Sequence, residues 1–404
     1  MKRKIKKRIK IIFILLILII LVIGSDQFYF KNKPINIDDK KSEINNTKKE
    51  NIETNKVKLT LVGDFLFEQP FYDAINSGYN KEEYFSLVKK YFIDDDLSIG
   101  NMEVVIGNSS LKTSGVGYNF CAPEYIGDLV NTLDLQVLGT ANNHAFDRGK
   151  SGILSTLNYF KNNTYIKTVG TRENNDNSFL LYIEKNGVKF GITAYTYGTN
   201  QKTNSDDRKL INYYKDENGN INKESIKGDI QELKENSDVV IVLMHWGLEF
   251  RYNPNNEQKE LANYLNELGV DIIVGSHSHN ISPIEKIQNK NSTLVYYSLG
   301  NFVSHDDDIA RTPIGEEEFD NAYQFGLLST LEITKSSDKI NIDNVKTNII
   351  VNYFDNNMSN FKLIPLDDYS EDYEKSHFRY NKGLTKEFIY NTYNKIIDEK
   401  YRNI

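Results

Sequence analysis

Three of the six histidines in this chain stand within one stretch, and each follows a run of apolar residues. His245 comes soon after a run at residues 238–243, and His277 and His279 follow a run at residues 271–274. Short runs of β-branched and aliphatic residues are typical of buried parallel strands. Ligands of open α/β sheets bind at the carboxyl ends of such strands. We therefore expect the three imidazoles to face a metal ion or a substrate.

Carboxylate and amide side chains follow the ends of other predicted strands. Asp64 and Glu103 each come shortly after a predicted strand, and Asn143 with His144 follows a third one. If these strands are parallel, all of the groups share one edge of a sheet. Carboxylates, amides and imidazoles together suit two divalent cations that are bridged by one carboxylate.

Each group also has a structural interpretation when it is taken alone. Asp64 could cap the helix that follows it, and Glu103 could be an ordinary loop carboxylate. Asn142 and Asn143 could form a turn, because asparagine tolerates a left-handed backbone. His245 could be a core histidine whose hydrogen bonds are satisfied.

The neighbouring polar residues are open to similar interpretations. Asp147 is expected to cap the next helix, with Arg148 as a solvated neighbour, and the acidic run at residues 306–308 is expected to be solvated. The metal-site hypothesis rests on the whole set, because four of the six histidines fall at strand ends. The pair His277 and His279 also places two imidazoles on one short turn, where they can face different metal ions.

These groups need a framework of alternating strands and helices, and the sequence predicts one. Strands are expected at residues 57–62, 97–99, 135–139, 179–184, 188–194, 238–243, 271–274, 293–299, 325–333 and 340–351. Helices are expected at residues 82–91, 123–133, 150–161, 226–235, 257–268 and 384–401. Residues 185–187 should close a hairpin, 199–227 should form a polar surface loop, and 305–321 should form an acidic loop. The repetition of strand, loop and helix indicates an α/β fold.

The first 56 residues differ in composition from the rest of the chain. Residues 1–10 carry seven Lys and Arg side chains, and thirteen uninterrupted apolar residues follow them. We expect an uncleaved transmembrane signal-anchor at 11–30 with a basic cytoplasmic tail, a flexible linker at 31–56, and an extracellular remainder. A cleaved signal peptide is the alternative, but no small-x-small cleavage motif follows the apolar run. The folded domain is expected at 57–365, with a C-terminal helical extension at 366–404.

The composition narrows the possible ligands. Cys121 is the only cysteine, so the chain can form neither an internal disulfide nor a thiolate metal site. The net charge is −7, and subtracting the seven positive charges of the acid-free basic tail leaves −14 for the remainder. This acidity argues against nucleic-acid binding. An anionic substrate would have to be attracted locally by bound cations.

Six short motifs follow one another along the chain. They are Gly63-Asp64, Asn101-Met102-Glu103, Asn142-Asn143-His144 with Asp147 and Gly149, His245-Trp246-Gly247, Gly275-Ser276-His277-Ser278-His279 and Ser298-Leu299-Gly300-Asn301-Phe302. This ordered series resembles the CapA family of capsule and poly-γ-glutamate assembly proteins, whose domain is similar to calcineurin-like metallophosphoesterases. The resemblance covers roughly residues 57–302. It implies a metallophosphoesterase-like α/β/β/α sandwich of two mixed sheets.

The resemblance also implies a centre with one or two divalent metal ions, for which Mn, Fe and Zn are comparably suitable. The implied metal ligands are Asp64, Glu103, Asn143, His245, His277 and His279. The first ion would bind Asp64 and His279, and Glu103 would bridge it to the second ion. The second ion would also bind Asn143, His245 and His277.

Other residues of the motifs acquire roles from the same resemblance. His144 would be the catalytic residue that stabilises or protonates the leaving group. Contacts to the substrate or to the metal ligands would come from Asn101, Asn142, Asp147, Arg148, Trp246 and Asn301.

One position departs from the pattern of the superfamily. Two residues after Asp64 the superfamily carries a metal-binding histidine, but this chain has Leu66. The first ion would then keep only Asp64, Glu103 and His279, unless Glu68 folds back to replace the imidazole. The site of the second ion is therefore the more complete of the two.

Three hypotheses about function follow. The resemblance places first a membrane-anchored extracellular protein of capsule or poly-γ-glutamate biosynthesis or export, with a metal-dependent hydrolase-type site. The second is an extracellular metal-dependent phosphoesterase, and the third is a non-enzymatic metal-binding scaffold of a polymer synthesis complex. The expected partners are the cell membrane, an anionic polymer or phosphoester substrate, and other membrane subunits of a polymer synthase. Nucleic acid is not an expected partner.

Overall fold

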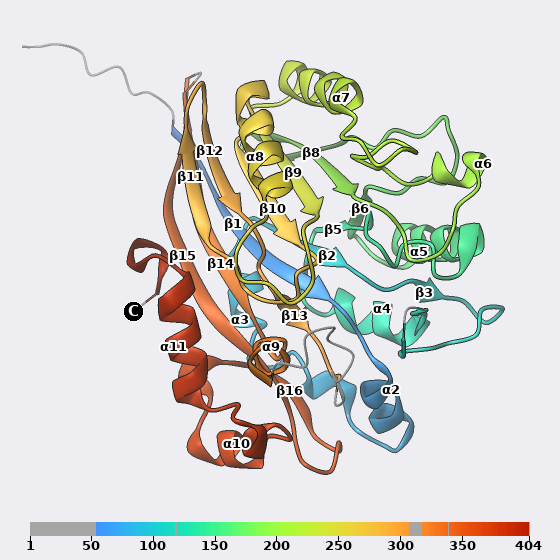
Figure 1. The fold of residues 1–404 in the computed structure, drawn as a ribbon, viewed down its shortest axis with the longest axis vertical. Coiled ribbons are helices and arrows are strands. Elements are labelled where there is room, and N and C mark those ends of the chain that lie inside the picture. Colours follow the sequence, from blue (N-terminus) through green and yellow to red (C-terminus); the bar gives the residue numbers. More distant parts are fainter. Residues whose placement is uncertain (1–53, 118, 307–316, 338, 404) are drawn as a thin grey trace, which may run out of the picture. The chain divides into compact units, whose positions relative to one another are not determined.

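The computed structural model describes residues 54–403, apart from residues 118, 307–316 and 338 (Figure 1). The predicted basic tail and signal-anchor, and residues 31–53 of the predicted linker, lie outside the described residues. The last residues of that linker belong instead to the first strand, which begins at Thr54. Among the helices that the structure describes, none is long and apolar enough to cross a bilayer.

One mixed sheet contains the strands that carry Asp64 and precede Glu103. Its strand order is β16-β15-β14-β1-β2-β5-β6, and β13 pairs with β1 outside this path. The strands are β1 (Thr54–Phe65), β2 (Leu97–Met102), β5 (Val137–Gly139), β6 (Lys167–Val169), β13 (Asn301–Val303), β14 (Phe325–Ser336), β15 (Lys339–Phe354) and β16 (Phe361–Pro365). Strands β1, β2, β5, β6 and β13 are parallel, whereas β14 to β16 are antiparallel.

The second mixed sheet carries the histidine motifs. Its strand order is β11-β12-β10-β9-β8-β7. The strands are β7 (Leu181–Lys185), β8 (Val188–Thr196), β9 (Val239–His245), β10 (Ile272–Ser276), β11 (Ile284–Gln288) and β12 (Ser292–Tyr296). The predicted hairpin joins β7 to β8, where Asn186 and Gly187 have φ angles of 49° and 76°. Two consecutive positive φ angles are typical of the tight turns that suit a twisted hairpin.

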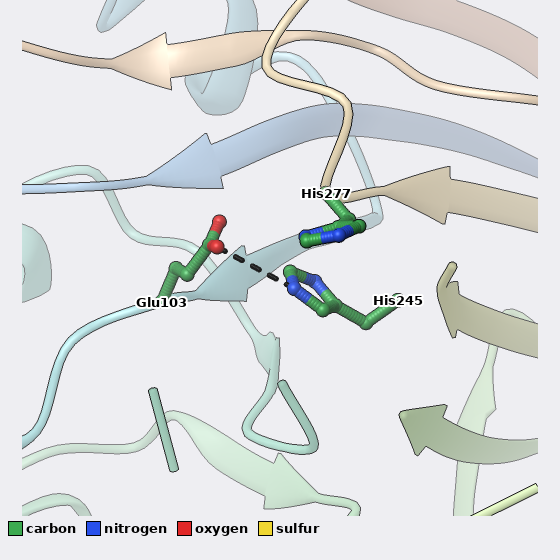
Figure 2. Close-up of side chains that lie close together, drawn as sticks. All are labelled: Glu103, His245 and His277. Atoms are coloured by element: carbon green, nitrogen blue, oxygen red, sulfur yellow. Dashed lines mark ion pairs between the residues drawn. The ribbon is translucent and has the colours of Figure 1, made fainter. Parts of the chain in front are cut away.

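The carboxyl ends of parallel strands from both sheets meet at one place. Asp64 lies near the end of β1 in the first sheet, and His245 ends β9 in the second. Figure 2 shows Glu103, which directly follows β2, reaching toward His245 and His277. The prediction that all of these groups share one edge of a single sheet is therefore wrong, because they come from two sheets that face each other.

Helices cover the outer faces of both sheets. Those beside the first sheet are α2 (Gln69–Asn76), α3 (Lys90–Ile93), α4 (Glu124–Asn131) and α5 (Gly149–Asn163), and those beside the second are α7 (Lys223–Asn236) and α8 (Asn256–Leu268). Helix α8 shows how the local sequence fixes its ends. Asn255 and Gln258 form a reciprocal capping box at its start, and Gly269 ends it with a φ angle of 92°.

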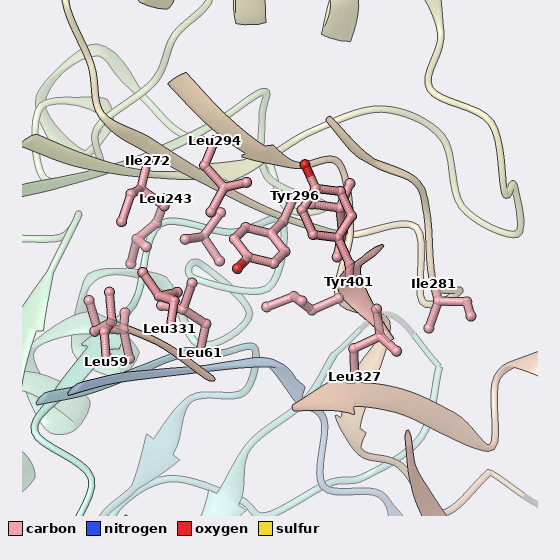
Figure 3. Close-up of a cluster of buried hydrophobic side chains, with 14 of the residues drawn as sticks. Leu59, Leu61, Leu243, Ile272, Ile281, Leu294, Tyr296, Leu327, Leu331 and Tyr401 are labelled. Carbon is pink, nitrogen blue, oxygen red and sulfur yellow. The ribbon is translucent and has the colours of Figure 1, made fainter. Parts of the chain in front are cut away.

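Three hydrophobic cores separate these layers. The inner core lies between the sheets, where Leu59 and Leu61 pack in one cluster with Leu243 and Ile272 (Figure 3). One outer core joins the first sheet to its helices, and the other joins the second sheet to α7 and α8. Side chains along β1 alternate between faces, so Leu61 lies in the inner core and Val62 in an outer core. The predicted sandwich of two mixed sheets flanked by helices is confirmed.

Several predicted elements differ from the observed ones. The helix predicted at 82–91 is instead divided: residues 84–89 form turns between the 3-10 helix Lys81–Glu83 and the short α3. The predicted polar loop at 199–227 contains α6 (Ser205–Arg208) and the first turn of α7, and the described end of the acidic loop forms α9 (Glu317–Ala322). Two very short strands, β3 (Ile106–Gly107) and β4 (Ala122–Pro123), form a small sheet that the sequence did not predict.

The C-terminal extension packs against the first sheet. It contains α10 (Glu371–Ser376) and α11 (Lys386–Ile396), so the helix predicted at 384–401 is shorter than expected. The Tyr393 hydroxyl of α11 donates a hydrogen bond to the carbonyl of Thr347 in β15, at 2.9 Å. Side chains of α11 also belong to the inner hydrophobic core.

Candidate metal centre

The first cluster of metal-type ligands lies where β2, β9 and β10 end. Ligand atoms of Glu103, His245 and His277 all lie within 4.8 Å of one another. Oε1 of Glu103 is 3.4 Å from Nε2 of His245 (Figure 2), and Oδ1 of Asn143 is 2.8 Å from the same nitrogen. The structure thus brings together the four residues that the resemblance assigns to the second ion.

A second cluster shares Glu103 with the first. Ligand atoms of Asp64, Glu103 and His279 also lie within 4.8 Å of one another. Nδ1 of His279 is 3.7 Å from Oδ2 of Asp64, and its Nε2 is 3.8 Å from Oε1 of Glu103. Because Glu103 belongs to both clusters, its carboxylate is shared between them.

The residues fit divalent cations because buried ligand atoms lack other partners. Neither carboxylate oxygen of Glu103, nor Nδ1 of His277, has a hydrogen-bond partner of acceptable geometry among the described residues. The neighbouring Asp64 carboxylate can offer Glu103 a hydrogen bond only when one of the two is protonated. A buried polar group without a partner costs on the order of 1–3 kcal/mol. Carboxylates and imidazoles together are suitable donors for Mn, Fe or Zn.

The electrostatics of the site favour the neutral forms of its groups when no cation is bound. Burial raises the pKa of Asp64 from 3.8 to about 6, and burial together with the Asp64 charge holds the pKa of Glu103 well above its usual range. Burial lowers the pKa of His279 to about 4 and the pKa of His245 well below its usual range. A neutral imidazole is the form that binds metal, and a nearby cation would favour ionised carboxylates.

His144 is held in place by a buried carboxylate. Its Nδ1 lies 2.7 Å from Oδ2 of Asp147, whose side chain is buried. With the carboxylate oxygen as acceptor, Nδ1 is the donor and Nε2 is the ring nitrogen that remains for a substrate. The same Asp147 oxygen accepts a hydrogen bond from the backbone of Phe120. The prediction that Asp147 caps α5 is wrong, since the N-cap of α5 is Arg148 and no side chain caps it.

Two asparagines contact side chains of the second cluster. Nδ2 of Asn101 donates to Oδ1 of Asp64 at 2.8 Å, and Oδ1 of Asn301 lies 2.9 Å from Nδ1 of His279. Partners of this kind fix the direction of a metal ligand and the tautomer of a histidine. Both asparagines thus contact candidate ligands, and their role at a metal centre stays a prediction.

Three other residues with predicted roles support the backbone around the site. Asn142 donates from Nδ2 to the carbonyl of Met102 at 2.8 Å, which joins the loop after β5 to the end of β2. Arg148 donates from Nε to the carbonyl of Lys112 at 3.1 Å. Trp246 is fully buried in the outer core of the second sheet and donates from Nε1 to a backbone carbonyl. Trp246 therefore packs away from the ligand clusters.

Glu249 is a candidate that the sequence interpretation missed. Ligand atoms of Glu249, His277 and His279 form a third group within 4.8 Å of one another. Glu68 does not take the place that the sequence proposed for it. Its carboxylate accepts hydrogen bonds from the backbone of His305 at 2.6 Å and from the hydroxyl of Tyr323 at 3.0 Å, and it is in none of the three groups.

A small pocket of about 60 Å³ opens beside the clusters. Its lining residues are Leu66, Glu68, Gly117, Phe120, His144, Glu249, Phe250, His279, Asp306 and Tyr323. The pocket thus joins His144 to the metal ligand His279. A much larger cleft of about 1170 Å³ lies at the amino ends of β9 and β10, where Asp238 and Asp271 line it. This cleft contains none of the candidate metal ligands. The candidate site is therefore identified by the chemistry of its residues and not by the size of a cavity.

Two facing sheets with buried carboxylates and imidazoles at their strand ends define the class: a layered α/β protein with a candidate metal centre between its sheets. Residues 58–306 match the family described as bacterial capsule synthesis protein PGA_cap. The chain belongs to this family, and the predicted CapA resemblance is confirmed.

Two curated relatives carry the CapA name. The chain is 29% identical over 248 residues to "PGA biosynthesis protein CapA" of Bacillus subtilis (strain 168), a match that covers 60% of this chain and 62% of that protein. It is 27% identical over 266 residues to "Capsule biosynthesis protein CapA" of Bacillus anthracis, covering 62% of this chain and 60% of that protein. The matches therefore span about three fifths of the length of these relatives.

Two solved structures align with the chain at low sequence identity. The calcineurin-like phosphoesterase YfkN from Bacillus subtilis aligns over 85% of this chain and 97% of its own, at 15% identity and a TM-score of 0.42. A phosphatase from Mycoplasma pneumoniae aligns over 74% of this chain and 95% of its own, at 16% identity and a TM-score of 0.43. Likeness at this level says nothing about activity.

Proposed function

We propose that this protein acts in the biosynthesis or export of an anionic capsule polymer, with poly-γ-glutamate as the first candidate, through a hydrolase-type site that binds divalent cations. The observation that carries the proposal is the position of Glu103. Its buried carboxylate belongs to two groups of metal-type ligands, and neither of its oxygens has a hydrogen-bond partner of acceptable geometry among the described residues. Membership of the capsule synthesis family supports a capsule polymer as the substrate.

The chemistry would be divided between cations and the His144 pair. Bound divalent cations would polarise an oxygen of the scissile group and lower the pKa of a water molecule beside it. His144, held by Asp147, would donate a proton from Nε2 to the leaving group, which is an amine for a γ-glutamyl amide. His144 and His279 line the same small pocket, so the proton donor and a metal ligand would face one substrate.

An extracellular phosphoesterase is the second candidate. The shared carboxylate and the buried His144 to Asp147 pair favour it, because phosphoryl transfer also needs neutralised oxygens and a proton for the leaving alkoxide. A non-enzymatic metal-binding scaffold would keep the cations but would not need His144. A requirement for His144 would therefore distinguish the two hydrolytic candidates from the scaffold.

We also propose a single-pass membrane location with the folded domain outside the cell. The seven basic residues in the first ten and the apolar run that follows support this orientation. Other membrane subunits of a polymer synthase would then be within reach. Labelling of an introduced exposed cysteine in intact cells would test the orientation, and protection from a membrane-impermeant reagent would contradict it.

The polymer proposal is tested in cells that produce the full chain with Glu103→Gln. We expect surface polymer, measured as glutamate released by acid hydrolysis, to be lost while the variant protein stays at its normal level. The control is Glu235→Gln, which changes an exposed carboxylate on α7. Normal polymer with Glu103→Gln would show that the shared carboxylate has no part in the function. Loss of polymer with Glu103→Gln but not with His144→Ala would favour the scaffold.

A further inference from the structure

We propose that Glu249 is a metal ligand that takes the place of the imidazole missing at Leu66, and that it completes the ion site formed by Asp64, Glu103 and His279. This inference rests on the proposed metal centre. It adds a carboxylate from the loop after β9 to the ligands that the sequence motifs predicted.

The loop that carries Glu249 is tied directly to the histidine turn. The backbone N–H of Phe250 donates to the carbonyl of Ser278 at 2.8 Å. Ser278 lies between His277 and His279, so this hydrogen bond holds the neighbouring Glu249 against both imidazoles. The three ligand atoms consequently lie within 4.8 Å of one another.

The backbone around these residues is held in an uncommon conformation. Phe250, His277 and His279 have φ angles of 56°, 91° and 58°, all in the left-handed region. Non-glycine residues rarely adopt positive φ angles, and such residues cluster at functional sites where the surrounding structure compensates for the strain. Here the conformation directs two imidazoles and one carboxylate toward the same point.

Glu249 has no other partner that would explain its position. Its side chain is partly buried, yet it makes no hydrogen bond and no ion pair with any residue that the structure describes. Nδ1 of the neighbouring His277 is a buried atom that lacks a hydrogen-bond partner among the described residues. A carboxylate that forms no ion pair among the described residues and lies beside an unpaired imidazole nitrogen is a suitable place for a cation.

Glu249 lies beside one ligand of each ion, His277 and His279, and the count of donors favours the ion of His279. Glu103, His245 and His277 already have Asn143 as a fourth donor, at 2.8 Å from Nε2 of His245. The Asp64 cluster has only three donors, because Leu66 is a buried apolar residue. Metal ions of this type bind four or more donors, water included, so this cluster has room for one more carboxylate.

The position of Leu66 makes the replacement possible. Leu66 and Glu249 line the same pocket of about 60 Å³, together with His279. The Glu249 carboxylate is therefore on the same pocket as both Leu66 and the candidate ligand His279. Two divalent ions would still carry more positive charge than Asp64, Glu103 and Glu249 neutralise, so the centre would continue to attract an anionic substrate.

The test is metal binding to the full chain, purified in detergent and stripped with a chelator. Mn²⁺ is titrated by calorimetry, and the spin coupling between two bound ions is followed by electron paramagnetic resonance. We expect two ions in the unchanged protein. With Glu249→Gln we expect the weaker ion to lose at least about 10-fold in affinity and the coupled signal to disappear, while the tighter ion is retained. Glu235→Gln is the matched control and should behave as the unchanged protein does.

The thermal midpoint of each variant without metal shows whether its fold is intact. If Glu249→Gln unfolds early, Glu249→Asp keeps the charge and is titrated in its place, with a weaker second ion expected. Two ions of unchanged affinity in a folded Glu249 variant would overturn the role of Glu249 and leave the metal centre standing. Failure of the unchanged protein to bind any Mn²⁺ would overturn the metal centre itself, and this inference with it.

Discussion

Replacing Glu103 by Gln should change stability in opposite directions with and without metal. Without metal, the buried carboxylate lacks a hydrogen-bond partner among the described residues and lies beside the Asp64 carboxylate. Leaving such a group unsatisfied costs on the order of 1–3 kcal/mol. Glutamine has the same shape, and its amide can donate a hydrogen bond to Asp64. We therefore expect Glu103→Gln to unfold at an equal or higher temperature than the unchanged protein when a chelator is present.

With metal the order should reverse. An ion that binds only the folded protein, at 100 times its dissociation constant, stabilises it by about 2.7 kcal/mol. For a domain of this size that corresponds to a rise in Tm on the order of 5 °C. Because Glu103 belongs to both ligand clusters, its replacement should remove most of this rise.

The assay is thermal unfolding of the full chain in detergent, with chelator and then with excess Mn²⁺. Glu235→Gln provides the control for the loss of one carboxylate from an exposed position. A Glu103→Gln variant that keeps the full metal-induced rise would refute the shared-ligand role. A variant that is markedly less stable than the unchanged protein in chelator would show that Glu103 is a structural residue.

Three further predictions test other parts of the structure. Burial raises the pKa of Asp271 to about 6, so as the pH rises the unfolded chain loses the Asp271 proton at a lower pH than the folded protein does. The free energy of unfolding should therefore fall by up to about 3 kcal/mol between pH 4 and pH 6. Asp271→Asn should remove this fall, and a variant whose stability has the same pH dependence as the unchanged protein would contradict the prediction. Asp147→Asn should lower any hydrolytic kcat by about 100-fold, because it removes the carboxylate that holds His144. The number of bound ions should not change, and an unchanged kcat would argue against His144 as the proton donor. Leu61→Ala should cost about 2–5 kcal/mol in urea unfolding, since Leu61 is fully buried between the sheets (Figure 3); a cost below 1 kcal/mol would contradict a tightly packed inner core.

The fold could be predicted where one element carries its own signal. Strands β9 and β10 are buried on both faces, so they appear in the sequence as continuous apolar runs. The division into two sheets has no such local signal. It depends on pairings such as β1 with β14, in which Val57 lies opposite Ile333. Strands of three residues such as β13 are too short to show a recognisable pattern of apolar residues in the sequence.

The candidate site was predicted to the extent that its residues follow strands. His245, His277 and Glu103 each end or directly follow a strand, and the structure brings them together. Glu249 was missed because it lies in a loop, where its position is fixed by a hydrogen bond between distant segments. Asp147 was assigned to a helix cap because nothing in the sequence shows that a backbone N–H from another loop would use its carboxylate.

The most direct test of the metal centre is a crystal structure of the protein grown with Mn²⁺ and measured at the manganese absorption edge. We predict two anomalous peaks, one on each side of the Glu103 carboxylate. One peak should lie among Asn143, His245 and His277, and the other should lie beside His279. If crystals of the full-length protein grown with saturating Mn²⁺ show no anomalous peak near Glu103, that result would contradict the metal centre.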